Sequence, residues 1–465
     1  MVSPTSSHRS AALPPSAPRP PRAPGAAPLL GHLPMLRKLG LLPALEQLHA
    51  ELGDVFTLRL GPRSMIVVAG PEGMERIFVS KVRNYTKHRA YAPIREFLGD
   101  GLVTLEGDPW RVRRRLIQPH FHRARLEQMV EGMVEVIDAW LADLRRRLPS
   151  GGVIDIHREM VALTLDIVFN ALFGPGLARG GEVRYEVLSD SIQVMNERVE
   201  GVPVPLWIPT ARNRRFKRTL AELDANVFAI IAAARRRAEP IPTLLGMLLE
   251  TVDDQTGEPL PDRAIRDEVM TLYVAGHETT ALMLTWLFAL TGERSDVWGG
   301  IEDELHRTLG GRVPRFAELP GLVYLRAVID ETLRMRPAVA ALSRDVVADD
   351  ELMGYRLEAG EFVLPYFFGL HHHPDLWDEP RRFDPGRFAP EAQSASARHK
   401  WSYMPFAAGP RMCIGNNFAL AEGALIISML LQRAEWTLEP GQQIEPVAAG
   451  TVRPSAPVNV RVRWK

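Results

Sequence analysis

The residue best suited to chemistry by type and setting is Cys413, the one cysteine among 465 residues. It lies in the segment Phe406-Ala-Ala-Gly-Pro-Arg-Met-Cys-Ile-Gly415, where glycines and a proline predict a tight loop. An apolar helical pattern, residues 417–433, follows directly. The first N–H groups of a helix carry positive potential, which favours a thiolate over a thiol. Cys413 is therefore either a small buried hydrophobe, the usual role of a lone cysteine, or the thiolate ligand of a metal centre.

Of the metal centres that a thiolate could bind, the sequence around Cys413 favours haem iron over structural zinc. A structural zinc site needs about four ligands, and no Cys or His pair lies near Cys413 at a suitable spacing. A haem iron needs only one proximal protein ligand, and a thiolate in that role favours O–O cleavage. His371, His372 and His373 offer no alternative, because adjacent histidines seldom converge on one ion. We expect them to lie in an ordinary loop.

A polar turn interrupts the longest helical pattern of the chain, residues 261–290. As a helix this segment would span ~40 Å, and its second half is apolar on all sides, which predicts burial. The turn reads Ala275-Gly-His-Glu-Thr-Thr280. Buried polar groups cost free energy unless they are hydrogen-bonded. Either the threonines bond back to the helix backbone, or the turn has a function.

Two charged motifs have ordinary explanations when each is taken alone. Glu331 and Arg334 lie three residues apart on one helix face, as in many surface ion pairs of little energetic value. The run Trp110-Arg-Val-Arg-Arg-Arg115 is the densest positive cluster, and such runs are usually solvated helix faces. Trp110 and Arg114 lie four residues apart and so share one face of that helix.

Together these motifs resemble the cytochrome P450 family. Phe406, Gly409, Arg411, Cys413 and Gly415 match every fixed position of its haem-binding signature, and the resemblance runs from about Pro24 to the C-terminus. It implies haem b as the cofactor, Cys413 as the ligand of its iron and Arg411 as a partner of a haem propionate. The other cofactor-binding residues that it implies are Trp110 and Arg114, which match a W-x-x-x-R pair, together with Arg344, Ala275, Gly276, Phe406 and Gly415.

The resemblance also gives the polar turn a function. Glu278 and Thr279 match the acid–alcohol pair that delivers protons during oxygen activation. Gly276 would allow the haem to approach the helix backbone closely. His277 is not carried over as a catalytic residue, and we expect it to face away from the iron.

The remaining charged residues receive structural or docking roles. Glu331, Arg334 and Arg387 match the three members of the family's structural lock, although Gly386 replaces the acidic residue common at that position. Arg114 contacts haem in this interpretation, which leaves Arg111, Arg113 and Arg115 to attract an acidic electron donor.

The expected fold is mainly α-helical with small β-sheets, the triangular prism of this family. Residues 1–28, rich in Pro, Ser, Ala and Arg, are interpreted as a disordered leader that is not a signal peptide. Residues 29–465 are expected to form a single haem-binding catalytic domain. Helical patterns cover residues 110–148, 160–173, 184–199, 212–237, 261–290, 322–336 and 417–433, and strand patterns cover 55–60, 64–69, 355–357, 362–365 and 458–462. Residues 374–404 form a long irregular stretch.

The expected function is that of a haem-thiolate monooxygenase, which inserts one atom of O2 into an apolar substrate by hydroxylation or epoxidation. The alternatives are a peroxide-driven or isomerising haem-thiolate enzyme and a non-catalytic haem sensor, and the Glu278–Thr279 pair argues against both. The substrate would be a lipophilic terpenoid, steroid, fatty acid or polyketide. The resemblance places the substrate pocket at Phe97, Leu98, Leu272, Ala338, Val339, Ala340 and Leu342.

Composition and motifs also restrict the partners. Lys plus Arg and Asp plus Glu each total 56, so the zero net charge does not indicate nucleic acid or an anionic membrane as a partner. No apolar stretch reaches the ~18–20 residues that span a bilayer, and one cysteine fits a reducing, cytoplasmic setting. No G-x-G-x-x-G fingerprint occurs, so a separate ferredoxin or flavodoxin-type donor with its reductase must supply electrons. We expect a soluble monomer.

Overall fold

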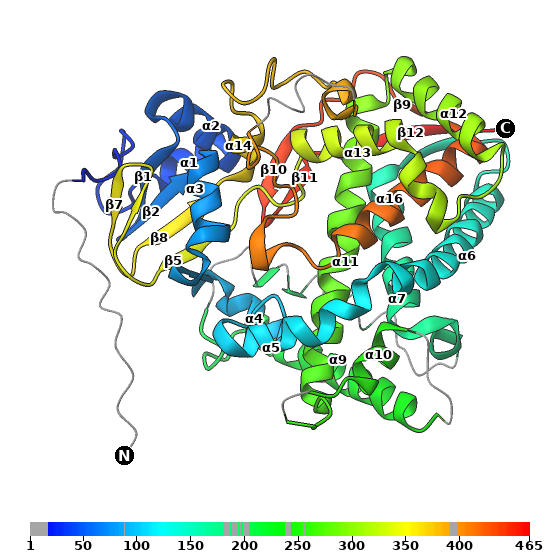
Figure 1. Ribbon diagram of the computed structural model, residues 1–465, viewed down its shortest axis with the longest axis horizontal. Coiled ribbons are helices and arrows are strands. Elements are labelled where there is room, and N and C mark those ends of the chain that lie inside the picture. Colours follow the sequence, from blue (N-terminus) through cyan, green and yellow to red (C-terminus); the bar gives the residue numbers. More distant parts are fainter. Residues whose placement is uncertain are drawn as a thin grey trace.

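The computed structural model is mostly helical (Figure 1). It describes residues 17–87, 89–179, 204–237, 243–253, 256–390 and 399–465, together with residues 187, 191, 194, 195, 197 and 198. Its α-helices are α1 (Leu33–Leu39), α2 (Leu41–Leu52), α3 (Pro71–Glu75), α4 (Ala92–Leu98), α5 (Gly107–Ile117), α6 (Arg123–Arg147), α7 (Ile156–Arg179), α9 (Ala211–Arg235), α10 (Leu244–Glu250), α11 (Asp262–Thr291), α12 (Ser295–Leu309), α13 (Val323–Met335), α14 (Phe367–His371) and α16 (Asn416–Arg433).

Small sheets complete the fold. The largest has the strand order β1-β2-β8-β5-β3, formed by β1 (Val55–Leu60), β2 (Arg63–Val68), β8 (Phe362–Pro365), β5 (Arg344–Val346) and β3 (Tyr85–Lys87). Its strands pair antiparallel except β2 with β8, which are parallel. The others are β4 (Gly152–Asp155), β12 (Asn459–Trp464) and β9 (Ala434–Leu438) in one sheet, and the pairs β6 (Asp350–Leu352) with β7 (Tyr355–Leu357) and β10 (Pro446–Ala449) with β11 (Thr451–Pro454).

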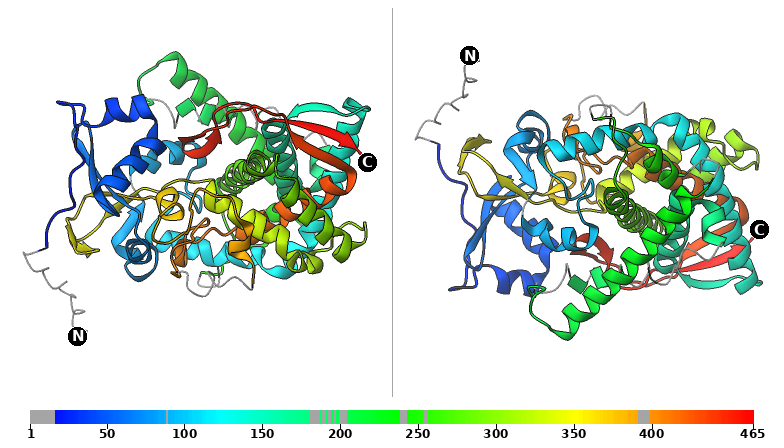
Figure 2. Two further views of the ribbon diagram at one scale, coloured as in Figure 1. Left: turned by 90° about the horizontal axis from the view of Figure 1, so that it is seen from above. Right: turned by 90° about the horizontal axis from the view of Figure 1, so that it is seen from below.

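The long helix α11 is the central element of the molecule. It packs against α7, α9, α13 and α16, and Figure 2 shows it nearly end-on with the other helices around it. All of its residues from Ala281 to Phe288 are buried, on every side of the helix, as the all-round apolar pattern predicts. The sheet with β1 and β2 lies at the opposite end of the molecule from β9 and β12 (Figure 1).

The structure corrects two boundaries taken from the sequence. The helical pattern at residues 110–148 is two helices, because Pro119 lies in a 3-10 turn, Gln118–Phe121, between α5 and α6. The predicted disordered leader, residues 1–28, extends too far along the chain. The N–H of Ala23 donates to Thr57 O at 2.9 Å, and the N–H of Thr57 donates to Pro21 O at 2.8 Å. Residues 21–23 therefore lie against β1. Residues 1–16 and most of the helical pattern at 184–199 lie outside the described residues.

Candidate functional site

A cavity of about 360 Å³ lies between α11 and the loop that carries Cys413. Its wall is mainly apolar. Among its lining residues are Trp110, Arg114, Leu272, Ala275, Gly276, Thr279, Ala338, Val339, Leu342, Arg344, Phe406, Arg411, Cys413 and Gly415. Residues from distant parts of the sequence thus meet at one site, and they include every cofactor-binding residue that the sequence analysis named.

The Cys413 loop is held in a shape that requires glycine at position 409. The Cys413 N–H donates to Phe406 O at 2.9 Å, which closes the loop. Gly409 has a φ of +62°, and a Cβ there would lie 2.2 Å from Phe78 O, so a side chain is excluded at this position. Gly415, two residues after the cysteine, is the N-cap of α16. The loop therefore presents Cys413 to the cavity at the positive end of a helix.

Opposing effects act on the thiol of Cys413. Burial within the protein raises its pKa, while a hydrogen bond from the backbone of Gly415 and the charge of Arg114 lower it. The side chain nevertheless has an exposed surface, and that surface faces the cavity. A bound cation would shift the balance to the thiolate, since metal-ligating thiols are deprotonated.

Four cationic side chains line the same cavity, and no acidic side chain is among its described lining residues to balance their charge. They are Lys87, Arg114, Arg344 and Arg411. Arg411 pairs with Glu106 at 2.5 Å and stacks over Trp110 at 3.7 Å, yet its buried Nη1 has no hydrogen-bond partner among the described residues. Desolvation first, and then the charge of Arg411, lower the pKa of Lys87 to about 7.

These features fit haem b. The cavity offers one thiolate ligand, apolar walls and an unpartnered guanidinium nitrogen among clustered cations, which two propionate groups would neutralise. Lys87 and Glu106 belong to this cluster, but the sequence analysis did not name them. Glu106 could have been found from its position four residues before Trp110, whereas no local motif marks Lys87.

The polar turn of α11 divides between the cavity and the protein interior. Thr279 lines the cavity, and its Oγ1 donates to Ala275 O at 2.9 Å. The Glu278 carboxylate is directed to β11, where Arg453 Nη2 lies at 2.6 Å and the Thr451 hydroxyl donates at 3.1 Å. The alcohol and the acid are therefore neighbours in the chain that face different surroundings.

Two further residues of the turn have clear packing contacts. His277 is buried and absent from the cavity lining, and its Nδ1 lies 3.0 Å from Tyr273 O. A Cβ on Gly276 would lie 2.9 Å from Val168 Cγ2 of α7. The absence of a side chain at Gly276 therefore permits the close packing of α7, in addition to any approach of the haem.

The Glu331 and Arg334 side chains form a buried pair and not a surface one, since both are 0% exposed. Arg334 Nε and Nη2 donate to the two carboxylate oxygens at 2.7 and 2.8 Å. Arg387 Nε lies 3.5 Å from Glu331 Oε1, so the three expected members meet. They lie outside the cavity lining, as a structural lock should.

The expected substrate pocket is only partly placed at the cavity. Leu272, Ala338, Val339 and Leu342 line it, whereas Phe97, Leu98 and Ala340 do not. Phe97 and Leu98 are packed in the core instead, and Ala340 is buried in a second apolar cluster. Lining residues that the sequence analysis missed include Leu102, Val103, Phe121, Val168, Ala171, Leu244 and Met283.

The arginine run is less available to a partner than expected. Arg113 is mostly buried and pairs with the fully buried Glu268 at 2.7 Å, which corrects its assignment to a docking face. Arg111 pairs with Asp108, and both Arg111 and Arg115 remain about half exposed. Within this run, Arg111 and Arg115 are the arginines exposed enough to meet an electron donor.

The three histidines do not converge on one another. His371 accepts the Met404 N–H at 2.9 Å, and His373 joins His49 and Asp54. The Nε2 atoms of His49 and His373 each lie 2.9 Å from Asp54 Oδ1. Because His373 Nδ1 accepts the N–H of Asp375, its Nε2 carries the proton and donates to the carboxylate. This group is a hydrogen-bonded cluster in which the nitrogen nearest the carboxylate is not free to bind a metal.

Comparison with known proteins agrees with this geometry. The sequence model of the family described as Cytochrome P450 matches residues 20–462. Cyclooctatin synthase of Streptomyces melanosporofaciens is 34% identical over 401 residues, 85% of each chain. Pentalenene oxygenase of Streptomyces avermitilis is 33% identical over 402 residues, 86% of this chain and 88% of that protein. The solved haem domain of cytochrome P450DA has a TM-score of 0.86 at 27% identity, over 96% of this chain and 98% of that one.

The family's fold and cofactor thus match the cavity and its single thiolate. Within the residues that the structure describes, no helix is both long and apolar enough to cross a bilayer. The chain belongs to the cytochrome P450 family of haem-thiolate monooxygenases.

Proposed function

We propose that this enzyme hydroxylates or epoxidises a neutral, lipophilic molecule of terpenoid type, with Cys413 as the haem ligand. The observation that carries the proposal is the composition of the cavity wall. The part formed by α11 and by residues 338–342 offers small apolar side chains and threonine hydroxyls, while the cations gather where haem propionates would lie. Burial of apolar surface, about 25 cal/mol per Å², can therefore supply the binding energy.

The relatives support the same substrate class. One is named for the oxygenation of pentalenene, an alkene by its name. Ala338 and Val339 are small, which leaves room for a bulky ring system next to the cofactor. Because no charged group lies on that part of the wall, we place neutral terpenoid-like molecules ahead of fatty acids.

In this proposal each part of the site has a separate task. Haem b, when bound, supplies the oxygen-activating chemistry. Cys413 Sγ holds the cofactor in place, and Arg114, Arg344 and Arg411 bind its carboxylates and so fix its orientation. Thr279 Oγ1 holds a proton at the cavity wall.

The proposed route for protons leads from β11 to the cavity. Arg453 and the Thr451 hydroxyl hold the Glu278 carboxylate in place next to β11. There it can accept a proton and pass it toward Thr279, its neighbour in α11. The two side chains thus connect the interior at β11 with the site of reaction.

The electron donor is a separate ferredoxin or flavodoxin-type protein with its reductase. The support is the lack of a dinucleotide fingerprint in the sequence and the exposure of Arg111 and Arg115. We further propose that the enzyme is active as a monomer.

Cys413→Ala tests the ligand assignment, since the chain has no second cysteine. The variant should lose the red-shifted Soret band of the reduced carbon monoxide complex, and retention of that band would refute the assignment. For the substrate, a panel of lipophilic and charged compounds is scored by the haem spin-state shift of the wild-type enzyme. Shifts from charged compounds alone would overturn the pocket interpretation. Product formation driven by peroxide, with none from NADH and ferredoxin, would favour the peroxide-driven alternative.

A further inference from the structure

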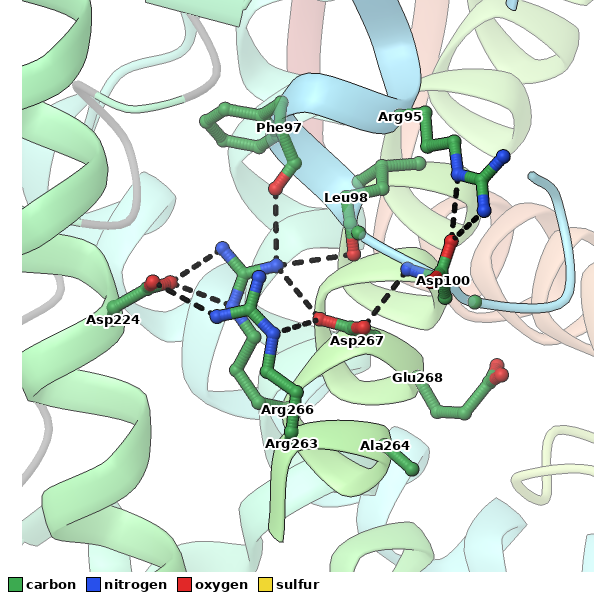
Figure 3. A network of polar contacts seen from close by, with 12 residues as sticks. Arg95, Phe97, Leu98, Asp100, Asp224, Arg263, Ala264, Arg266, Asp267 and Glu268 are labelled. Carbon is green, nitrogen blue, oxygen red and sulfur yellow. Dashed lines mark hydrogen bonds and ion pairs between the residues drawn. The ribbon is translucent and has the colours of Figure 1, made fainter. Parts of the chain in front are cut away.

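Arg266 is a fully buried arginine of α11 that binds three segments of the chain at once (Figure 3). Its Nε and Nη2 lie 2.6 and 2.5 Å from Asp224 Oδ1 of α9. Its Nη1 donates to Phe97 O and Leu98 O, each at 3.0 Å, at the end of α4. One side chain therefore joins α9, α11 and the C-terminus of α4. A planar guanidinium can do this, because its donors point in several fixed directions.

The next two residues of α11 bind the segment that follows α4. Asp267 Oδ2 accepts the N–H of Asp100 at 2.8 Å, and Glu268 Oε2 accepts the N–H of Leu102 at 3.1 Å. Figure 3 shows the first of these bonds beside Arg266. Three consecutive residues of α11 thus fix the backbone of residues 97–102.

Two glycines allow this close approach. A Cβ on Gly99 would lie 2.2 Å from Asp267 Oδ1, and a Cβ on Gly101 would lie 2.0 Å from Thr271 Oγ1. Gly99 also has a φ of +75°, which side chains rarely adopt. The segment is therefore built to lie against α11 at backbone distance.

The fixed segment leads directly into the wall of the haem cavity. Leu102 and Val103 line the cavity, and so do Thr271 and Leu272 on the next turn of α11. A shift of residues 97–102 away from α11 would move Leu102 and Val103 and open the cavity to water. The position of this wall depends on the contacts of residues 266–268.

We propose that Arg266 is a positioning residue that closes the substrate cavity. By pairing with Asp224 and binding the carbonyls at 97 and 98, it holds residues 97–103 against α11, and with them the cavity wall at Leu102 and Val103. The wall then excludes water and fits the substrate, so that electrons are used for product and not for peroxide. The substrate part of this statement rests on the function proposed above, whereas the position of the wall does not.

Arg266→Met tests the proposal, and Arg263→Met is the matched control. Arg263 lies one turn earlier on α11 and reaches the same carboxylates, Asp224 at 3.3 Å and Asp267 at 3.4 Å. It is 60% exposed, and among the described residues its polar contacts are with these carboxylates and not with backbone carbonyls. The two variants therefore lose the same charge, but only Arg266→Met releases the loop.

Three measurements are made on the haem-loaded enzymes. In Arg266→Met, amide hydrogen exchange at Asp100 and Leu102 should be faster by about tenfold or more, because local opening then costs less free energy. The spectral dissociation constant of an apolar ligand should rise by about tenfold, and product per NADPH should fall. Arg263→Met should match the wild type within about twofold in all three.

A second variant covers the case in which Arg266→Met does not fold. Arg266→Lys keeps the charge near Asp224 but has no planar fork for two carbonyls, so exchange at residues 97–102 should still rise while the fold is retained. Unchanged exchange and unchanged ligand affinity in Arg266→Met, or in Arg266→Lys where Met does not fold, would overturn the proposal. If exchange rises but wild-type enzyme gives no spin-state shift with any apolar ligand, the proposed substrate class fails and the wall assignment stands.

Discussion

Arg334→Met should strongly destabilise the enzyme, because Arg334 and Glu331 are both fully buried. The change keeps most of the side-chain volume but removes the charge. It leaves the Glu331 carboxylate with Arg387 at 3.5 Å and the N–H of Asp384 at 2.9 Å. The carbonyls of His371 and Pro380, each 2.8 Å from Arg334 Nη1, lose their donor.

The size of the effect follows from these contacts. Breaking a buried ion pair by removing one partner costs ~3–5 kcal/mol. Arg387 offsets part of this cost, so we expect a loss of about 3 kcal/mol. The free energy of unfolding is measured by urea titration, followed by tryptophan fluorescence and by the haem-thiolate band.

Arg326→Met is the control for this measurement. Arg326 pairs with Asp330 on the same helix at 2.8 Å but is 53% exposed. Because Arg326 is open to solvent and Asp330 keeps the hydrogen bond from the Tyr403 hydroxyl, we expect this pair to contribute less than ~1 kcal/mol. Equal losses in the two variants, or a loss below about 1 kcal/mol in Arg334→Met, would refute the buried-pair reasoning.

Three further outcomes are expected. Thr279→Ala should bind haem and substrate normally but form less product per NAD(P)H, and an unchanged ratio would remove its proposed role. Reversing the charge of Arg111 and Arg115 should slow reduction by the donor and flatten its salt dependence, as measured by stopped flow; Arg113 is left intact because it pairs with Glu268. Burial raises the pKa of Glu422 well above its usual value, so this carboxyl takes up a proton on folding once the pH exceeds that usual value. The free energy of unfolding should therefore fall as pH rises above ~4.5, by up to ~1.4 kcal/mol per pH unit. Glu422→Gln should reduce this slope, as measured by urea titrations at pH 6 and 8. An identical slope in the wild type and the variant would contradict the prediction.

Local motifs predicted the centre of the site better than its walls. The loop around Cys413 and the helix after it depend on glycines and apolar periodicity within some 30 residues, and the structure has both. The mainly helical fold was predicted from apolar periodicity, which is likewise a local pattern. The break between α5 and α6 was missed because apolar periodicity continues through Pro119.

Contacts between distant residues could not be predicted from local patterns. Arg113 looked like part of a solvated run, but its partner Glu268 is 155 residues away. Phe97 and Leu98 are apolar and near the right loop, yet α11 holds their backbone so that their side chains enter the core. The sequence around Glu278 likewise gives no indication of Arg453, which lies on a strand 175 residues later.

The two sides of the cavity are anchored to different parts of the fold, and this bears on how new substrate ranges arise. Residues 338–342 are attached to strands: the Leu342 N–H donates to Pro365 O at 3.1 Å, and Ala338 O accepts the N–H of Val452 at 2.9 Å. They are not part of the network of buried charged residues at 266–268. Exchanging Ala338 or Val339 for larger side chains would thus reshape the pocket without disturbing that network. For directed evolution of regioselectivity, this side of the cavity is the one that can vary while the closing wall and the long helix stay unchanged.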